Sequence, residues 1–442
     1  MKTRELRQSA RLIWEAALNA ANPATCLRKF LQLKDNVLIV GGKEVNITGR
    51  LIVIGAGKPS AKMAQVVEEI LGSYISDGLI VTKYGHALPL RRMKLVEAAH
   101  PIPDSAGIHA VHETRELLRG LGKDDIVLVL ISGGGSALWP APAEGITLEE
   151  KQEVTHLLLR AGATIRELNA VRKHLSAIKG GQLAKWASPA RVISLIMSDV
   201  IGDPIDFIAS GPTAPDTTSF SDALAIIQKY GLELPQDVRE RFQQGSRGNI
   251  PETPKPGDPV FKNVENYVIG NNRLLIDAAM HKARELQFNT LILGTEIEGE
   301  AKDIGRFFAA MTRETARNGG DPVGLPACIL AAGETTVTVR GHGVGGRNQE
   351  MALAWAISMA ARPFSGNACF ASVATDGSDG PTTAAGGLVD PFTCSRAIEL
   401  GLMPQKFLRA NDSSNFLKTT GDLIVTGPTQ TNLMDLQILL VG

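Results

Sequence analysis

The sequence predicts two α/β domains, the first built on a parallel sheet and the second on a mixed sheet. Its 442 residues are about three times the ~150 residues that one domain usually takes. Short apolar runs end at glycines and lead into stretches with helical spacing, which is typical of parallel α/β construction. A segment over 243–264 interrupts this order with four prolines and several glycines, so it is the best candidate for a linker.

The N-terminal domain is expected to cover 1–262 and to hold a Rossmann-like sheet that ends at the linker. Its predicted strands are 50–54, 78–82, 125–131 and 192–197. Its predicted helices are 60–71, a segment that begins near Thr147, and about 169–186. Thr147 and Glu150 have capping-box spacing, and Gly180-Gly181 interrupt the last of these helices.

The C-terminal domain is expected to cover 263–442, where the strand–helix alternation resumes. Its predicted strands are 267–269, 290–293, 329–332, 336–339, 373–375 and 423–426. The third and fourth flank Gly333-Glu334-Thr335 and suggest a hairpin. A hairpin among strands that are otherwise joined by helices predicts a mixed sheet.

Composition excludes several classes of protein. Lys plus Arg and Asp plus Glu both number 46, and a protein held to nucleic acid by counterion release would show a basic excess. No stretch approaches 18 apolar residues, and the amphipathic N-terminus is unlike a signal peptide. The four separated cysteines indicate reduced core thiols in a cytoplasmic protein. A homo-oligomer is left open.

The first motif is Gly55-Ala56-Gly57-Lys58, which follows an apolar strand. Glycine-rich loops that enter helices expose N–H groups to anions, and Lys58 adds a full charge. Pro59 stands where a Walker A loop has Ser or Thr, and Ser60 replaces the third glycine of a dinucleotide fingerprint. A structural turn and a phosphate or carboxylate site both remain open.

A second loop of this kind is Ser132-Gly133-Gly134-Gly135-Ser136. Three consecutive glycines are costly in conformational entropy, and an oxyanion nest, with the serines as added donors, would explain them. The alternative is a tight strand-to-helix turn.

Acidic residues follow the next apolar strand. Asp199 comes directly after it, and Asp203 lies in the same loop. Open α/β sheets bind ligands at this edge, and carboxylates together with phosphate oxygens suit Mg²⁺. Asp203, next to Pro204, could instead form a turn.

In the second half, Gly345-Gly346-Arg347 lead into a helical segment. An arginine beside a helix N-terminus concentrates positive potential, whereas a structural arginine usually sits on a helix face. Asp376 and Asp379 in the sequence TDGSDG are candidates for metal or substrate binding, and an Asp-Gly turn pair is the alternative.

Taken together, the motifs occur in the order GAGK, HPIPD, ISGGGSAL, LNAVRKHLSAIKGGQLA, SDVIGDPIDFIASGPT, GETTVTV, GGRNQEMALA, ATDGSDGPT and TGPTQTNLMDL. The chain resembles the class II glycerate 2-kinases over about 10–436, with a MOFRL-type region at about 325–436. The resemblance implies an ATP-binding kinase that phosphorylates D-glycerate to 2-phosphoglycerate with Mg²⁺. It also implies a site in the cleft between the two domains.

The same resemblance implies active-site roles for Lys58 and Arg347, with Asp199 as a third catalytic residue. One departure is visible: the family commonly has PTDAAG after DGSDG, whereas Thr382 and Thr383 follow Pro381 here. Any acidic role at that position is therefore in doubt.

Two other functions compete with the kinase. Members of the family are often labelled hydroxypyruvate reductases, but an NAD(P)H enzyme needs a dinucleotide fingerprint that this sequence lacks. A non-enzymatic sensor of phosphosugars or carboxylates could use the same anion nests without consuming ATP.

Overall fold

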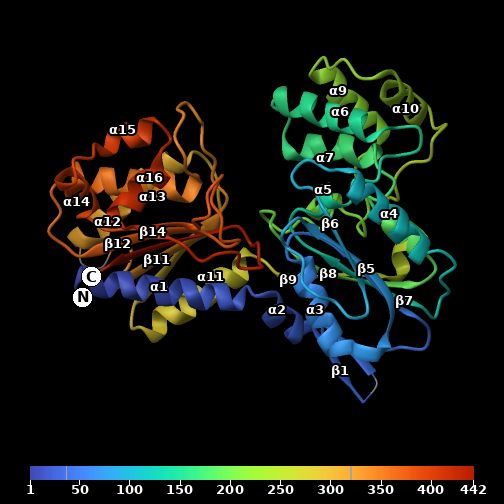
Figure 1. Cartoon of the computed structure of the whole chain (residues 1–442), viewed down its shortest axis with the longest axis horizontal. Helices are drawn as coiled ribbons and strands as arrows, with labels where there is room; N and C mark the ends of the chain where they lie inside the picture. Colours follow the sequence, from blue (N-terminus) through green and yellow to red (C-terminus); the bar gives the residue numbers. More distant parts are fainter. Residues whose placement is uncertain (36, 319–320) are drawn as a thin grey trace. The chain divides into compact units, whose positions relative to one another are not determined.

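The chain divides into two compact units in a computed structural model that describes residues 1–35, 37–318 and 321–442 (Figure 1). The N-terminal unit is Cys26–Ile269, and the C-terminal unit joins Met1–Thr25 to Gly270–Gly442. The chain therefore passes between the units twice.

The core of the N-terminal unit is a six-stranded sheet in the order β6-β5-β4-β7-β8-β9. Its strands are β4 (Leu51–Ala56), β5 (Ile75–Lys83), β6 (Lys94–Ala98), β7 (Ile126–Ile131), β8 (Arg191–Met197) and β9 (Val264–Gly270). Counted along the chain the order is 3-2-1-4-5-6, that of a doubly wound Rossmann sheet. The registered pairs β4–β5, β4–β7, β5–β6 and β7–β8 all run parallel. The predicted Rossmann-like parallel sheet is confirmed.

Both faces of this sheet are covered, which explains why β4 and β7 are apolar and buried at every position. The flanking helices are α3 (Ser60–Leu71), α4 (Ser105–Leu117), α5 (Gly135–Leu138) and α8 (Gln182–Ala187). Ile52, Ile54, Val127 and Val129 alternate along the strands and share one core with Ala110 of α4. The helix predicted over 60–71 matches α3.

Four further helices of this unit gather around a core of their own, visible as the group labelled α6, α7, α9 and α10 in Figure 1. They are α6 (Leu148–Arg160), α7 (Ile165–His174), α9 (Phe220–Lys229) and α10 (Gln236–Ser246). The capping box of Thr147 and Glu150 is present. The predicted break at Gly180-Gly181 separates α7 from α8.

Among the elements of this unit that were not predicted are β6, α4, α9 and α10, and the following smaller ones. Helix α2 (Pro23–Phe30) leads into a small antiparallel sheet of β1 (Leu31–Lys34), β2 (Val37–Val40) and β3 (Lys43–Asn46). Short 3-10 turns are η1 (Gly72–Tyr74), η2 (Ile208–Ser210) and η3 (Pro259–Asn263).

The proline-rich segment lies within the N-terminal unit and does not join the two units. The Asp216 N–H donates to the Pro254 carbonyl oxygen at 2.9 Å, and the segment leads through η3 into β9 at the edge of the sheet. Sequence analysis placed the domain boundary at 262/263, whereas the units divide at 25/26 and 269/270.

The C-terminal unit has a six-stranded sheet in the order β10-β11-β15-β12-β13-β14. Its strands are β10 (Asn289–Ile297), β11 (Ala327–Gly333), β12 (Ala368–Ala374), β13 (Gly386–Val389), β14 (Leu423–Ile424) and β15 (Asp435–Val441). β10 and β11 run parallel, and the other neighbours run antiparallel. The predicted mixed sheet is confirmed.

Helices cover both faces of the mixed sheet. They are α1 (Thr3–Ala20), α11 (Asn272–Glu285), α12 (Ala301–Asn318), α13 (Arg347–Ala360), α14 (Thr393–Glu399), α15 (Pro404–Arg409) and α16 (Ser413–Thr420). In Figure 1, α1 and α11 lie on one side of the strands, and α12, α13 and α16 lie on the other. Phe308, Trp355 and Phe370 are buried together in the core under α12 and α13.

The predicted hairpin over 329–339 is wrong. The strand beside β11 on its inner side is β15, from the far end of the chain. Thr336 instead exchanges backbone hydrogen bonds with the loop before α12: its N–H donates to Gly299 O, and its carbonyl accepts from Ala301 N, both at 2.8 Å. The Thr-Val alternation over 336–339 resembles a strand. The segment 435–441 is buried at every position, so placing it beside β11 removes more apolar surface from water than placing 336–339 there would.

Helix α1 is fastened to this unit by ion pairs. Arg7 lies 2.7 Å from Asp390 and 2.9 Å from Asp422, and the two carboxylates are only 4% and 1% exposed. Arg396 contacts the same pair of carboxylates. Buried carboxylates need such partners, because ionised groups lose most of their hydration when they are buried.

We expect Arg7→Ala to lower the free energy of unfolding of the C-terminal unit by about 1–3 kcal/mol, the usual value of a hydrogen bond to a charged group. Urea unfolding measures this difference. Arg4→Ala is the matched control, because Arg4 is exposed on the same helix. Equal stability of the two variants would show that Arg7 does not hold α1 in place.

Candidate functional site

The two glycine-rich loops of the N-terminal unit meet where the order of its sheet reverses. One follows β4 and the other follows β7, and these strands are neighbours. The Lys58 N–H donates to Gly133 O at 2.8 Å, and the Ser132 N–H donates to Ala56 O at 3.2 Å. Ligands of open α/β sheets bind at such a switch point.

Glycine is required in both loops for close packing. Gly57 has φ +149°, and a Cβ there would lie 1.9 Å from Ser132 Oγ. Gly134 has φ +87°, and its Cβ would lie 3.0 Å from the His100 ring and 3.4 Å from Lys58 Cγ. Lys58 and His100 therefore both approach the Gly134 backbone.

The two loops differ in what they offer a ligand. The N–H groups of Gly57 and Lys58 are used within the protein, by Val81 O and Gly133 O. For Gly133 and Gly134, no such acceptor is present in the described part of the chain. The loop after β7 therefore supplies backbone N–H groups, and the loop after β4 supplies the Lys58 ammonium group.

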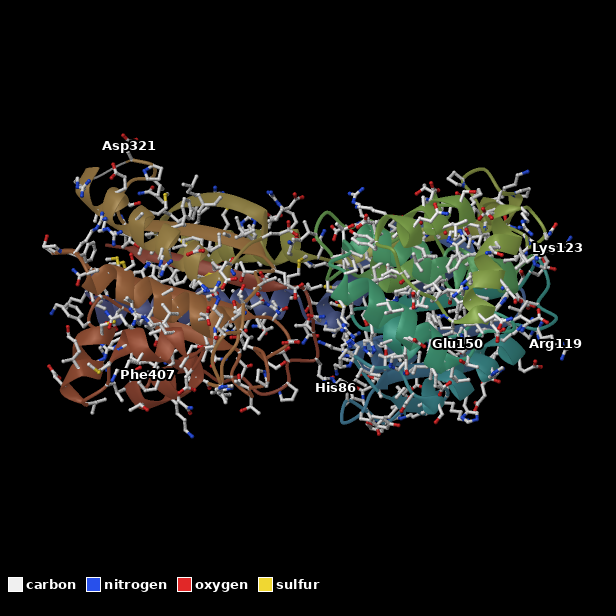
Figure 2. The ribbon with its side chains drawn as sticks, turned by 90° about the horizontal axis from the view of Figure 1, so that it is seen from above. His86, Arg119, Lys123, Glu150, Asp321 and Phe407 are labelled. Carbon is white, nitrogen blue, oxygen red and sulfur yellow. The ribbon has the colours of Figure 1, made fainter. Side chains whose placement is uncertain are left out.

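His100 is a residue of this region to which sequence analysis gave no role. Burial, with the charges of Lys58, Lys83 and His86, lowers the pKa of His100 to about 4. The ring is therefore neutral at physiological pH. His86, one of the residues whose charge acts on His100, follows the carboxyl end of β5. Figure 2 shows it on the opposite side of this unit from Arg119 and Lys123, which precede the amino end of β7.

The two serines of the second loop lie in different surroundings. Ser132 is fully buried, and its hydroxyl faces Gly57. Ser136 Oγ lies 2.9 Å from Arg172 Nη2, 2.9 Å from Lys179 Nζ and 2.9 Å from Ser210 Oγ. Since a charged arginine can only donate, Ser136 accepts from Arg172.

The turn that presents Ser210 has a strained backbone. Ala209, Ser210 and Gly211 have φ values of +51°, +61° and +63°, a region that costs non-glycine residues about 1–2 kcal/mol each. The N–H groups of Gly180 and Gly181 donate to Ser210 O and Gly211 O at 3.0 and 2.8 Å. The break between α7 and α8 thus holds this turn in place.

The acidic loop after β8 lies one strand from the switch point. Asp199 follows β8 after one residue, Ser198, and is partly buried. Asp203 has φ +53°, and its N–H donates to Val200 O at 3.1 Å, so it also forms a turn. Across 1–35, 37–318 and 321–442, no group of three or more His, Cys, Asp or Glu side chains is placed to hold a metal ion. Two carboxylates still suit Mg²⁺, which takes its other ligands from phosphates and water.

In the C-terminal unit, Arg347 begins α13 and is held by two carboxylates. Its Nε and Nη2 lie 2.5 and 2.9 Å from the two oxygens of Asp435, and its Nη1 lies 3.1 Å from Glu334. Burial alone would lower the pKa of Arg347, but the hydrogen bonds and charge of Asp435 raise it above its usual range. Asp435 is fully buried, so the pair is bidentate and the guanidinium is fixed.

Asp379 caps the helix that carries Arg347. Its carboxylate accepts from the backbone N–H groups of Asn348 at 3.1 Å and Gln349 at 2.8 Å. A Cβ on Gly346 would lie 2.3 Å from the Asp379 carboxyl carbon, so glycine is needed there. Burial and the charge of Asp435 raise the pKa of Asp379 to about 6.

The other candidates in this unit are placed as follows. Asp376 Oδ1 accepts from the N–H and hydroxyl of Ser378 at 3.0 and 3.1 Å, which is an Asx turn. A Cβ on Gly345 would lie 2.2 Å from Ser413 Oγ. Ala374, at the end of β12, pairs with Asp435, at the start of β15. Asp376 and Asp379, which follow β12, therefore lie at the same end of the sheet as Asp435.

Sequence reasoning missed Asp435, Arg172 and Lys179. Asp435 stands 88 residues from Arg347 in sequence, and only its position before an apolar run marks it. Arg172 and Lys179 lie in the motif LNAVRKHLSAIKGG, where charged residues usually indicate a solvated helix face. The signal that could have found them is the absence of acidic residues between Asn169 and Gly181.

The N-terminal unit is of the Rossmann type and has glycine-rich loops at its switch point. The C-terminal unit fixes an arginine at a helix start. Both features are typical of proteins that bind phosphate or carboxylate groups. Two family models match the chain: "Domain of unknown function (DUF4147)" over residues 9–243 and "MOFRL family" over residues 327–435. Together they include all the candidate residues of both units.

Relatives identify the family. Glycerate 2-kinase of Pyrococcus horikoshii is 43% identical over 435 residues, which is 98% of this chain and 96% of that protein. A putative hydroxypyruvate reductase of Agrobacterium vitis is 42% identical over 99% of this chain and 94% of that protein. The crystal structure of glycerate kinase from Thermotoga maritima has a TM-score of 0.88 and 40% identity, over 99% of this chain and all of that one. The chain belongs to the class II glycerate kinase family.

The titration of Asp379 makes a prediction about stability. Its folded pKa of about 6 lies above the ~3.9 of an unfolded Asp. Between about pH 4 and 6 the folded chain keeps a proton that the unfolded chain releases, so stability decreases as pH rises. We expect the wild type to lose about 3 kcal/mol over this range relative to Asp379→Asn. Urea unfolding at several pH values measures it, and parallel profiles would contradict it.

The pair of Arg347 and Asp435 makes a second prediction about stability. An arginine lining a solvated cleft would contribute little to stability, but Arg347→Ala would leave the buried Asp435 carboxylate without its bidentate partner. We expect this variant to lose about 3–5 kcal/mol. The double variant Arg347→Ala/Asp435→Asn should recover most of that loss. Thermal and urea unfolding of the two single variants and the double variant test this, and additive losses would refute the coupling.

Proposed function

We propose that this protein is a glycerate 2-kinase that transfers the γ-phosphoryl group of ATP to the 2-hydroxyl of D-glycerate, giving 2-phosphoglycerate and ADP. The observation that carries the proposal is the similarity to proteins named glycerate kinase over nearly the whole chain. The switch-point loops supply what phosphoryl transfer needs, namely positioned N–H groups and a lysine.

Lys58, Asp199 and Arg347 are the proposed catalytic residues. Lys58 neutralises charge on phosphate oxygens at the loop where Gly133 and Gly134 have N–H groups to offer. Asp199 would either accept the proton that leaves the 2-hydroxyl as the new O–P bond forms and the bond to ADP breaks, or serve instead as a ligand of Mg²⁺. Arg347, fixed by Asp435 and Glu334, offers its remaining N–H donors to the anionic reactants.

Asp199 and Asp203 are the proposed holders of Mg²⁺. When bound, the ion would neutralise phosphate charge and help to orient the nucleotide. The remaining candidates for contact with substrate or nucleotide lie in four loops, after β4, after β7, before α13 and after β12: Gly55, Gly57, Ser132, Gly133, Gly134, Gly135, Ser136, Gly345, Gly346, Asp376 and Asp379. Asp379 and the glycines would act by shaping these loops, as their close contacts indicate.

A hydroxypyruvate reductase is the second candidate, since one relative carries that name and the strand order 3-2-1-4-5-6 is common to nicotinamide-binding domains. Two observations oppose it. Ser60, at the third glycine position, is buried, and its hydroxyl oxygen lies 2.6 Å from Gly57 O and 2.7 Å from Val81 O, so its one hydrogen is used within the protein. The second strand ends at Thr82-Lys83, where an acidic residue would bind the ribose.

A cytoplasmic setting is part of the proposal. All four cysteines are buried thiols without a disulfide, as the sequence predicts. Among the described residues, no helix combines the length and the apolarity that a membrane span requires.

The deciding experiment is an assay with ATP, D-glycerate and Mg²⁺, with the product identified by NMR. We expect formation of 2-phosphoglycerate, its loss in EDTA and its recovery with Mg²⁺ or Mn²⁺. A parallel assay with NADH or NADPH and hydroxypyruvate should show no oxidation of the cofactor. Reductase activity without kinase activity would replace the proposal, and full kinase activity in EDTA would remove the metal from it.

A further inference from the structure

A small pocket of the N-terminal unit lies beside Ser136 and has an unusual lining. Its volume is about 230 Å³. Pro101, Ile102 and Leu159 give it apolar walls, and Ser136, Lys151 and Arg172 give it a polar, cationic floor. Ile102 and Leu159 are 57% and 56% exposed, so the walls are open to solvent.

Lys151 and Arg172 at this floor, and Lys179, which lies against Ser136 outside the pocket lining, have no acidic partners in the part of the chain that the structure describes. Lys151 Nζ donates to the carbonyl oxygens of Pro140 and Ala141, and Lys179 Nζ donates to Ser136 O at 2.7 Å and to Ser136 Oγ. Arg172 has one hydrogen bond, to Ser136 Oγ. In the described ranges, no Asp or Glu lies within ion-pair distance of these three side chains.

The neighbouring lysine shows the contrast. Lys173 follows Arg172 in α7 and is 1% exposed, and it lies 3.1 Å from Asp206 and 3.4 Å from Asp216. Two carboxylates from the chain after β8 therefore compensate Lys173, whereas its neighbour Arg172 has no acidic partner among the described residues. Burial and the charge of Arg172 hold the pKa of Lys179 well below its usual range. Unpaired buried charge is costly, and an anionic ligand would remove that cost.

Ser136 leaves Arg172 available to such a ligand. The Ser136 hydroxyl accepts from Arg172 and donates to Ser210, and Ser210 Oγ in turn donates to Asn169 Oδ1 at 3.1 Å. The guanidinium has five N–H groups and uses one here. The others lie on a residue that lines the pocket, in the planar arrangement that matches a carboxylate.

We propose that this pocket binds the carboxylate of a small 2-hydroxy acid, with Arg172 as its principal partner, Lys151 as a further donor that lines the pocket, and Lys179 supporting Ser136 from behind. The inference rests on the proposed function and adds to it the subsite of the acceptor substrate. A pocket of this size is below the ~300–1,000 Å³ of drug-sized ligands, which favours a three-carbon acid over a nucleotide. Ser136 directly follows the three glycines of the switch-point loop, so the acid would lie next to the proposed phosphate site.

The test compares the wild type with Arg172→Gln and Arg172→Lys. Binding of D-glycerate without ATP is measured by isothermal titration calorimetry, with inorganic phosphate as a second probe. Loss of a hydrogen bond to a charged group is worth about 10–100-fold in affinity. We expect that loss for D-glycerate in Arg172→Gln, a smaller loss in Arg172→Lys, and a KM for ATP within about threefold of the wild type.

Arg241→Gln is the matched control. Arg241 belongs to the same unit, donates to His174 O at 2.9 Å and does not line the pocket. Its affinity for D-glycerate should equal that of the wild type. The melting temperature should fall in this variant but not in Arg172→Gln, which removes an uncompensated charge.

The outcomes separate the subsite from the proposed function. Unchanged glycerate affinity in Arg172→Gln, or a loss confined to phosphate or ATP, overturns the subsite even if the wild type is a glycerate kinase. A wild type that makes no 2-phosphoglycerate but binds D-glycerate through Arg172 supports the subsite, while the proposed function fails.

Discussion

The contact between the loops after β4 and β7 is the constraint on which the candidate site of the N-terminal unit depends. The sheet order reverses between these strands, so their loops lead to different helices while their backbones remain adjacent. The hydrogen bond from Lys58 N–H to Gly133 O and the contact of Gly57 with Ser132 Oγ fix the two loops together. Lys58, His100 and the glycine N–H groups converge only because this contact is so close.

Two arginines of the candidate sites are held in opposite ways. In the C-terminal unit, Arg347 is held by Asp435 and Glu334 before any ligand arrives, so its position is preorganised. In the N-terminal unit, Arg172 and the nearby Lys179 contact Ser136, and no carboxylate of the described residues lies within ion-pair distance of them. Preorganised donors favour stabilisation of a transition state, whereas uncompensated cations favour binding of an anion from solution.

The sequence predicted the parts of the fold in which a local pattern and the three-dimensional environment agree. β4 and β7 are continuous apolar runs because both faces of the sheet are covered, and α3 begins where the glycine loop ends. The hairpin after β11 was wrong because a Thr-Val alternation does not reveal that a strand about 100 residues later, β15, takes the inner position. The glycine loops were recognisable from spacing. Asp435 and the acid-free surroundings of Arg172 depend on which distant side chains meet, which spacing does not encode.

The position of β15 has a consequence for the order of events during synthesis. This strand, the last of its sheet in chain order, lies in the middle of that sheet between β11 and β12, and the face beside it is covered by α1 from residues 3–20. On the ribosome, the sheet of the C-terminal unit cannot be completed until β15 has been synthesised, after all its other strands. Helix α1, although made before every strand of this sheet, must wait for its packing surface while the whole N-terminal unit emerges and becomes able to fold.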